Sequence, residues 1–235
     1  MMWRIFLAEG IKSKGICWWL PVIQAIILTM MTALEWYLYF RQGPEGVYAG
    51  FAVMYMFLSF VMMLGTTLLA SIVSSVEHDT RTWKQLLAMP VPRGLIYLSK
   101  AFWIILLQAL TALLIIAGMT TIWLLYTSEP IPWDVMLKQP LYAFVALLPA
   151  LAIQLWLSTR LANQALPLAV GIFGSIASLF LARTELSFLK ALPWAYPALS
   201  SPMIPGHLVW VMTGLVDGAL ILAVSTAFFA RREVL

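Results

Sequence analysis

Long stretches with few or no charged residues constrain this chain more than any other feature. A helix that crosses the hydrocarbon core of a membrane needs about 20 apolar residues, and six stretches reach that length. Their apolar residues run continuously rather than alternating as in the wall of a β-barrel. We therefore predict an all-α integral membrane protein, a single domain over 1–235, with spans at 15–39, 47–76, 97–127, 140–159, 161–182 and 207–230.

Composition supports this prediction. The chain is 63% hydrophobic and only 10% charged, whereas a soluble domain carries about 25% charged residues. With so few polar side chains the chain cannot coat a globule of 235 residues, so apolar surface has to face lipid. A single cysteine, Cys17, excludes a disulfide scaffold.

The basic residues predict the orientation. Six spans put both termini on one side, and Lys and Arg are enriched on the cytoplasmic side of membrane proteins. With the termini inside, the cytoplasmic segments hold Arg4, Lys12, Lys14, Arg81, Lys84, Arg93, Lys100, Arg160, Arg231 and Arg232. The outer loops then hold only Arg41, Lys138, Arg183 and Lys190. This asymmetry explains the pI of about 9.3 without nucleic-acid binding.

The first residues, 1–14, are not typical of a cleaved signal peptide, because charges are spread through them. Apolar residues at helical spacing, from Trp3 to Ile11, lie opposite Arg4 and Lys12. This pattern favours a short helix in the inner membrane interface, with a frayed basic flank of the first span as the alternative. Pro21 and Pro149 are expected to kink the first and fourth spans.

Enzyme chemistry is not indicated. The glycine-containing stretch 10–15 lacks the Lys-Ser/Thr ending of a phosphate-binding loop and the strand before it. The histidines, His78 and His207, fall on opposite sides of the predicted membrane, so they do not form a zinc pair. We expect no catalytic residue, no metal and no cofactor in this chain.

The loop at 77–93 is the most informative hydrophilic segment. Asp79 or Thr80 can cap a helix that Pro90 and Pro92 stop. Such a helix is too short to span the membrane and too apolar on one face to remain unpacked. It is expected to lie against the membrane surface or another protein.

This loop resembles the cytoplasmic loop of ABC-2 type (type 2) ABC transporter permeases. The closest likeness is to the six-span subunits of lantibiotic-immunity and related peptide or drug exporters. In that family, the acidic residue after the second span opens a coupling helix that docks on a separate ATPase. The resemblance assigns this role to Glu77, Thr82, Trp83, Leu86, Leu87, Pro90 and Arg93.

The resemblance implies partners as well. It predicts a cytoplasmic ABC ATPase that supplies ATP and Mg²⁺, and a second permease, identical or related. It places the chain in a bacterial inner or plasma membrane and implies outward movement of an amphipathic peptide, drug or lipid-like molecule.

Asp217 lies near the middle of the last predicted span, between Gly214 and Gly218. The two glycines form a face that lets another helix approach closely. A charged aspartate facing lipid costs roughly 3 kcal/mol, so Asp217 is expected to face protein or water. It belongs either to a translocation path or subunit interface, or to the packing of the bundle. Its candidate amide partners are Gln24, Gln108 and Gln154.

Two features on the predicted outer side have both a structural and a functional explanation. Glu35 sits among Trp36, Tyr37 and Tyr39, as a neighbour of an aromatic belt or as part of an outward-facing cavity. The segment 183–206 is too apolar for a solvated loop. We expect short helices that dip into the outer leaflet, or a loop that rests on the interface.

The favoured function is therefore a permease subunit of an ATP-driven exporter. A membrane scaffold or sensor that recruits another cytoplasmic partner is one alternative. A small ion-coupled carrier centred on Asp217 is the other.

Overall fold

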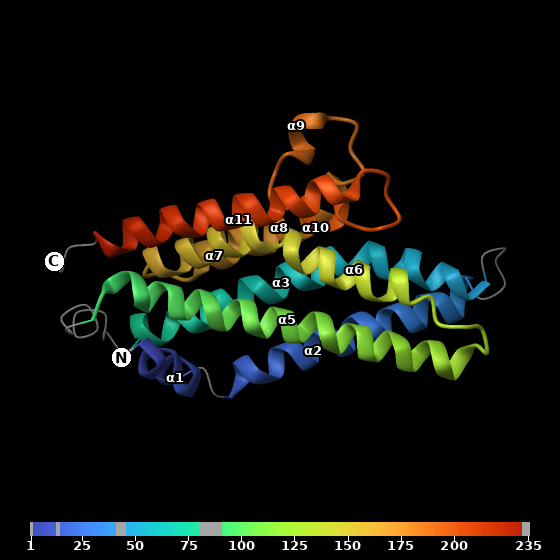
Figure 1. The fold of residues 1–235 in the computed structure, drawn as a ribbon, viewed down its shortest axis with the longest axis horizontal. Coiled ribbons are helices and arrows are strands. Elements are labelled where there is room, and N and C mark those ends of the chain that lie inside the picture. Colours follow the sequence, from blue (N-terminus) through green and yellow to red (C-terminus); the bar gives the residue numbers. More distant parts are fainter. Residues whose placement is uncertain (1, 13–14, 41–45, 80–90, 232–235) are drawn as a thin grey trace.

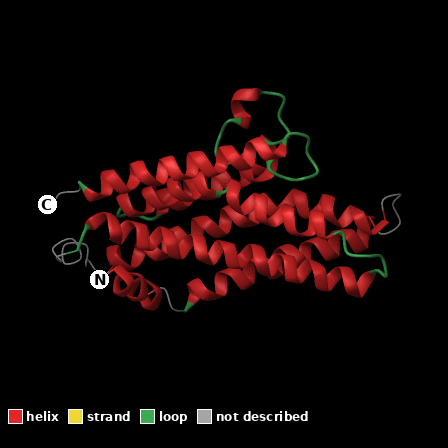
Figure 2. Cartoon of the chain, in the orientation of Figure 1, coloured by secondary structure: helices red, strands yellow, loops and turns green. Residues whose placement is uncertain are grey.

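The computed structural model describes residues 2–12, 15–40, 46–79 and 91–231, and it is built from helices with no strand in those ranges (Figures 1 and 2). The helices are, in chain order, α1 (Met2–Lys12), α2 (Ile16–Glu35), α3 (Ala49–Asp79), α5 (Arg93–Tyr126), α6 (Trp133–Ala146), α7 (Leu148–Arg160), α8 (Ala165–Leu181), α9 (Ser187–Lys190), α10 (Tyr196–Leu199) and α11 (His207–Ala230). A π-helical turn, η1 (Trp36–Phe40), continues α2, and a 3-10 turn, η2 (Gly46–Tyr48), precedes α3.

The long helices form an elongated bundle (Figure 1). Helices α2, α3, α5 and α11 are each long and apolar enough to cross a membrane, and α6 with α7 makes a fifth candidate span bent by 40°. The fifth predicted stretch, 161–182, contains α8, a shorter apolar helix of 17 residues, about 26 Å long at 1.5 Å per residue. The multi-pass helical architecture is confirmed, while the exact count of six stays a prediction.

The bend between α6 and α7 corresponds to the kink expected at Pro149. Leu147 separates the two helices, and Pro149 lies in the first turn of α7, where its missing N–H costs no helical hydrogen bond. Pro21, in contrast, lies inside α2, and the helix continues past it.

Several of the predicted boundaries differ from the structure; for example, α3 ends at Asp79 rather than at 76, and α8 begins at Ala165 rather than at 161. Helix α5 begins at Arg93 rather than at 97, and the fourth stretch begins at Trp133 rather than at 140. Lys138, expected in an outer loop, lies within α6, where it forms an ion pair with Asp134 one turn earlier. That pair is solvent-exposed and joins neighbouring turns of the helix.

Close helix approach at small residues holds the bundle together. A Cβ on Gly214 would meet the backbone of Ala146, and one on Gly218 would meet Leu148 and the backbone of Pro149. Helix α11 therefore crosses directly over the bend between α6 and α7. In α8, Gly171 packs against Thr67 of α3 in the same manner.

The segment before α11 contains two four-residue helices, as expected from its apolar character. Helix α9 projects from the bundle (Figure 1), while every residue of α10 is buried. Helix α10 packs against α6 and α11. The segment therefore anchors itself to the bundle through α10.

Candidate functional site

Four charged side chains gather at the end of the bundle where α3 stops and α5 starts. Glu9 comes from α1, Glu77 from the last turns of α3, and Lys100 from the second turn of α5. Lys12, at the end of α1, completes the group. Lys100 is fully buried, and the exposed fractions of Glu9 and Glu77 are only 3% and 1%.

Lys100 is the centre of this charge cluster, which we define as Glu9, Lys12, Glu77 and Lys100. Its Nζ donates to Glu77 Oε1 at 2.7 Å, to Glu9 Oε2 at 3.0 Å, and to the backbone carbonyl of Val73 at 3.1 Å. Lys12 Nζ reaches Glu9 Oε1 at 3.1 Å and Glu77 Oε1 at 3.3 Å. The cluster thus links three helices, α1, α3 and α5.

Because the cluster is buried, its charges are costly to separate. An isolated buried charge is expensive, and removing one partner of a buried pair typically costs about 3–5 kcal/mol. Two carboxylates and two ammonium groups balance one another within hydrogen-bond distance. The cluster therefore tolerates separation of α1 from α3 and α5 only at high cost.

A second contact clamps α1 onto α5. The indole Nε1 of Trp103 donates to the backbone carbonyl of Phe6 at 2.7 Å, and the Phe6 and Phe102 rings pack edge to face. Gly10 lies against the Trp103 ring so closely that a Cβ there would overlap it. Leu7 and Ile11 of α1 remain exposed, and the position of this helix in the membrane interface stays a prediction.

Most of the predicted ATPase-docking residues fall outside the described residues. Thr82, Trp83, Leu86, Leu87 and Pro90 belong to this group.

The two remaining residues of that set flank the loop. Glu77 does not open it, because α3 continues to Asp79, and the Glu77 side chain points into the charge cluster. Arg93 is half-buried and is the first residue of α5. The structure thus gives Glu77 a role inside the chain, at the base of the loop, rather than on an exposed docking surface.

Sequence reasoning did not identify Glu9 and Lys100 as partners of Glu77. One signal was available, because Glu9 lies three residues after Phe6, on the apolar side of α1. A charge on an apolar helix face requires a compensating partner. The separation of 91 residues between Glu9 and Lys100 leaves no local pattern that names that partner.

Asp217 is half-buried, and its partner is a tyrosine rather than a glutamine. Tyr196, in α10, donates from its hydroxyl to Asp217 Oδ2 at 3.0 Å, and its Oη lies equally close to the Ala191 carbonyl. Burial first, and then the hydrogen bond and the charge of Asp217, raise the pKa of Tyr196 to about 12. Asp217 therefore joins the segment 183–206 to α11, while Gly214 and Gly218 serve helix packing.

The remaining candidates lie apart from Asp217. Gln24 is buried between α2 and α5, where its Oε1 accepts from Gln108 Nε2 at 3.4 Å, and its side chain covers Gly65 of α3. Gln154 donates to the Pro167 carbonyl. Glu35 is half-buried at the end of α2. The structure does not bring these residues into one site.

Within the described ranges, no group of three or more His, Cys, Asp or Glu side chains is placed to hold a metal ion. The charge cluster offers ion pairs rather than an open ligand set. The role of the cluster is therefore structural, because it fixes three helices to one another beside the loop.

Comparison with protein families gives one match. Residues 5–178 match the model of a family described as ABC-2 family transporter protein. The matched region includes α1, α3, α5 and the loop between them. No curated protein matches the chain.

Proposed function

This chain belongs to the ABC-2 family of transporter proteins and is a permease component of an ABC transporter, and we propose that it moves amphipathic molecules out of the cell. Such permeases normally work with a cytoplasmic ABC ATPase. The energy for transport would thus come from ATP and Mg²⁺ bound to that partner.

One observation carries the coupling part of the proposal. The charge cluster ties α1, α3 and α5 together immediately beside the loop that would dock on the ATPase. A force applied to that loop would act on α3 and α5, the two helices that it joins. Because Lys100 is bonded to both Glu77 and Glu9, α1 would be displaced with them.

The proposed stroke begins when ATP closes the ATPase. Trp83, Leu86 and Leu87 would form the apolar ridge that seats in the ATPase, with Thr82 near the helix start and Pro90 at its end. Displacement of this helix would then shift α3 and α5 against the rest of the bundle, a hinge or shear motion. The bend at Leu147, over which α11 crosses, offers a place where the rest of the bundle can adjust.

Assembly and orientation complete the proposal. Two permease chains, identical or related, would associate with two ATPase subunits in the inner or plasma membrane of a bacterium. The charge cluster and both chain termini would lie on the cytoplasmic side, consistent with the basic residues there. The segment 183–206 would then cover the outer side, held by the Tyr196–Asp217 hydrogen bond.

Co-purification from native membranes tests this proposal. We expect an ATPase subunit to accompany the wild-type chain in mild detergent and to be lost from a Trp83→Ala, Leu87→Ala double variant. The matched control is Leu125→Ala, which removes an exposed apolar side chain at the end of α5 that lies farthest from the loop. A wild-type chain that purifies with no nucleotide-binding partner would contradict the exporter assignment.

Co-purification also addresses the first alternative, whereas the second needs a transport assay. A scaffold or sensor would retain a different cytoplasmic protein through the same loop. An ion-coupled carrier would instead lose transport on Asp217→Asn while remaining independent of ATP.

A further inference from the structure

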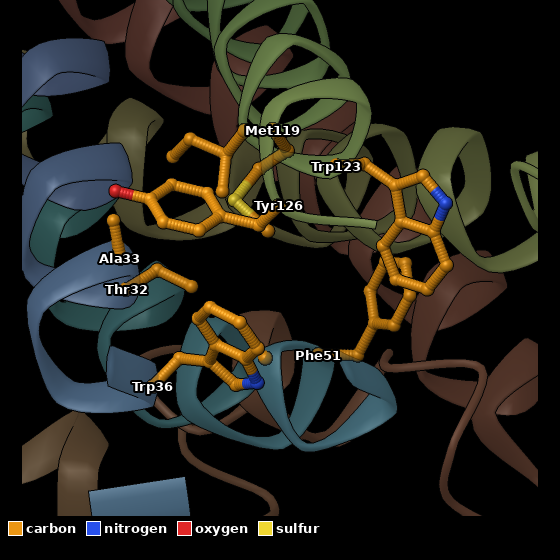
Figure 3. Close-up of a pocket in the computed structure, with 9 residues that line it drawn as sticks. Thr32, Ala33, Trp36, Phe51, Met119, Trp123 and Tyr126 are labelled. Carbon is orange, nitrogen blue, oxygen red and sulfur yellow. The ribbon is translucent and has the colours of Figure 1, made fainter. Parts of the chain in front are cut away.

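A small cavity lies at the end of the bundle opposite the charge cluster, between α2, α3 and α5 (Figure 3). Its volume is about 20 Å³. Aromatic rings form much of its wall, together with a thioether and small side chains. The lining residues are Thr32, Ala33, Trp36, Gly50, Phe51, Met119, Ile122, Trp123 and Tyr126.

Three polar side-chain groups of the wall, in Trp36, Trp123 and Thr32, donate their hydrogen bonds elsewhere. Trp36 Nε1 donates to the Gly46 carbonyl at 2.9 Å, and Trp123 Nε1 donates to the Glu129 carbonyl at 3.0 Å. The Thr32 hydroxyl donates to the Leu28 carbonyl at 2.8 Å, within its own helix. Apart from the Tyr126 hydroxyl, the wall therefore presents mainly ring faces and methyl groups.

This wall chemistry selects the occupant. A buried water needs two to four polar partners, and apolar cavities without them stay dry and take apolar guests. An apolar group that enters gains dispersion contacts that the wall atoms lack when the cavity is empty. The site therefore discriminates in favour of hydrocarbon and against hydroxyl or charged groups.

Access is provided on the side of Tyr126. Trp36, Phe51 and Trp123 are buried, whereas Tyr126 is about half exposed. The neighbouring Leu125 and Leu34 are exposed as well and face the surroundings of the bundle. Tyr126 packs edge to face on Trp36, with ring centroids 5.3 Å apart, so one side-chain rotation of Tyr126 would widen the entrance.

We propose that this aromatic cavity binds the apolar end of an amphipathic molecule that lies at the outer surface of the membrane. The inference rests on the orientation and the amphipathic substrate class given under the proposed function. It adds the place on this chain where such a molecule is held before release. In its present size the cavity accepts one methyl-sized group, and rotation of Tyr126 admits a longer alkyl end.

Gly50 supplies a precise test of occupancy. A Cβ added at Gly50 would approach only one atom within 4 Å, Trp36 Cδ1 at 4.0 Å. Gly50→Ala therefore adds a methyl group to the cavity without a clash, and alanine is the better helix former. The control is Gly94→Ala at the other end of α5, which also replaces a helical glycine with alanine and places its Cβ 3.2 Å from Thr226 Cγ2, far from the cavity.

The probe is an octanol that carries a diazirine near its methyl end. Photolabelling of the full chain in detergent, followed by peptide mass spectrometry, identifies the labelled residues. We expect label on Met119 and Thr32, which are 4% and 1% exposed and line the cavity. Gly50→Ala should reduce that label at least several-fold, and excess unlabelled octanol should compete it away.

Exposed Leu124 provides the internal reference, because a surface residue is labelled whether or not the cavity is open. Its label should stay unchanged in wild type, Gly50→Ala and Gly94→Ala. Label confined to exposed residues would overturn the proposal. So would label on Met119 that persists in Gly50→Ala or resists competition. Because labelling needs no ATPase, its failure is distinguishable from failure of the co-purification test.

Discussion

The two ends of the bundle hold helices together by different means. At one end, Lys100 joins α1, α3 and α5 through ion pairs of 2.7 and 3.0 Å. At the other end, Trp36, Phe51 and Trp123 join α2, α3 and α5 through ring contacts around a small cavity. Ion pairs in a buried setting fix one geometry, whereas ring contacts tolerate small shifts. This contrast fits the two proposals, in which the charge cluster transmits force from the ATPase and the aromatic cavity binds an apolar group.

Lys100→Met is expected to have the largest effect on this comparison. It removes the buried ammonium group that balances the Glu9 and Glu77 carboxylates, and the Val73 carbonyl loses its contact with Lys100 Nζ. We expect a loss of about 3–5 kcal/mol in unfolding free energy. The measurement is the thermal midpoint of the detergent-solubilised protein, or the amount of folded protein when the variant is too unstable.

The control for Lys100→Met is Lys138→Met, which removes a partner of the exposed ion pair with Asp134. That variant should keep the wild-type midpoint, because solvent-exposed pairs contribute little. Equal midpoints for the Lys100 and Lys138 variants would show that the charge cluster does not hold α1 in place.

Phe51→Leu tests the aromatic end and is expected to have an intermediate effect. It removes the ring that packs on Trp123, with centroids 5.4 Å apart, but leaves no charge unpaired. We expect a loss of about 1–2 kcal/mol, from altered core packing and one aromatic pair. The same thermal measurement applies, and a loss as large as that of Lys100→Met would remove the distinction between the two ends.

Lys12→Met should have the smallest effect on the unfolding free energy, and it measures the contribution of the exposed member of the charge cluster. Burial lowers the pKa of Lys12, but the charges of Glu9 and Glu77 and their hydrogen bonds outweigh it, so the pKa is raised above 10.5. Its side chain is 37% exposed, so water screens its pairs and we expect a loss of about 0.5–1 kcal/mol.

The raised pKa also sets the pH dependence of that contribution. Lys12 binds its proton more tightly in the folded chain, so its ion pairs stabilise the fold fully below pH 10.5, and this stabilisation disappears as the pH rises through the folded value. The difference in thermal midpoint between wild type and Lys12→Met should therefore be constant near neutral pH and shrink above 10.5. A difference that grows at alkaline pH would contradict this assignment.

Much of the fold could be predicted from patterns that lie within single segments of the sequence. The apolar stretches predict the positions of α2, α3, α5, α8 and α11, and Pro149 predicts the bend before α7. The spacing of Gly214 and Gly218 predicts a close helix approach, and the structure provides Ala146 and Leu148 as its partners. Local spacing suffices here because each signal belongs to one helix.

The site could be predicted only in part, because its contacts join distant segments. Glu77 was identified through its place before the loop, but its burial depends on Lys100 and Glu9, which lie on other helices. The prediction of a glutamine partner for Asp217 was wrong for the same reason, because α10 places the Tyr196 hydroxyl beside that carboxylate. The cavity could not be predicted either, because it forms only where side chains of three helices, α2, α3 and α5, leave a space between them.

The charge cluster has a consequence for the electrical behaviour of the transporter. Its two carboxylates and two ammonium groups carry formal charges that sum to zero. A net elementary charge moved through a membrane potential of 100 mV exchanges about 2.3 kcal/mol with the field, whereas a neutral group of ion pairs that moves as one body exchanges almost none. Displacement of α1, α3 and α5 together would therefore carry almost no gating charge from this cluster, and the work of moving it would be nearly the same in an energised and a depolarised membrane.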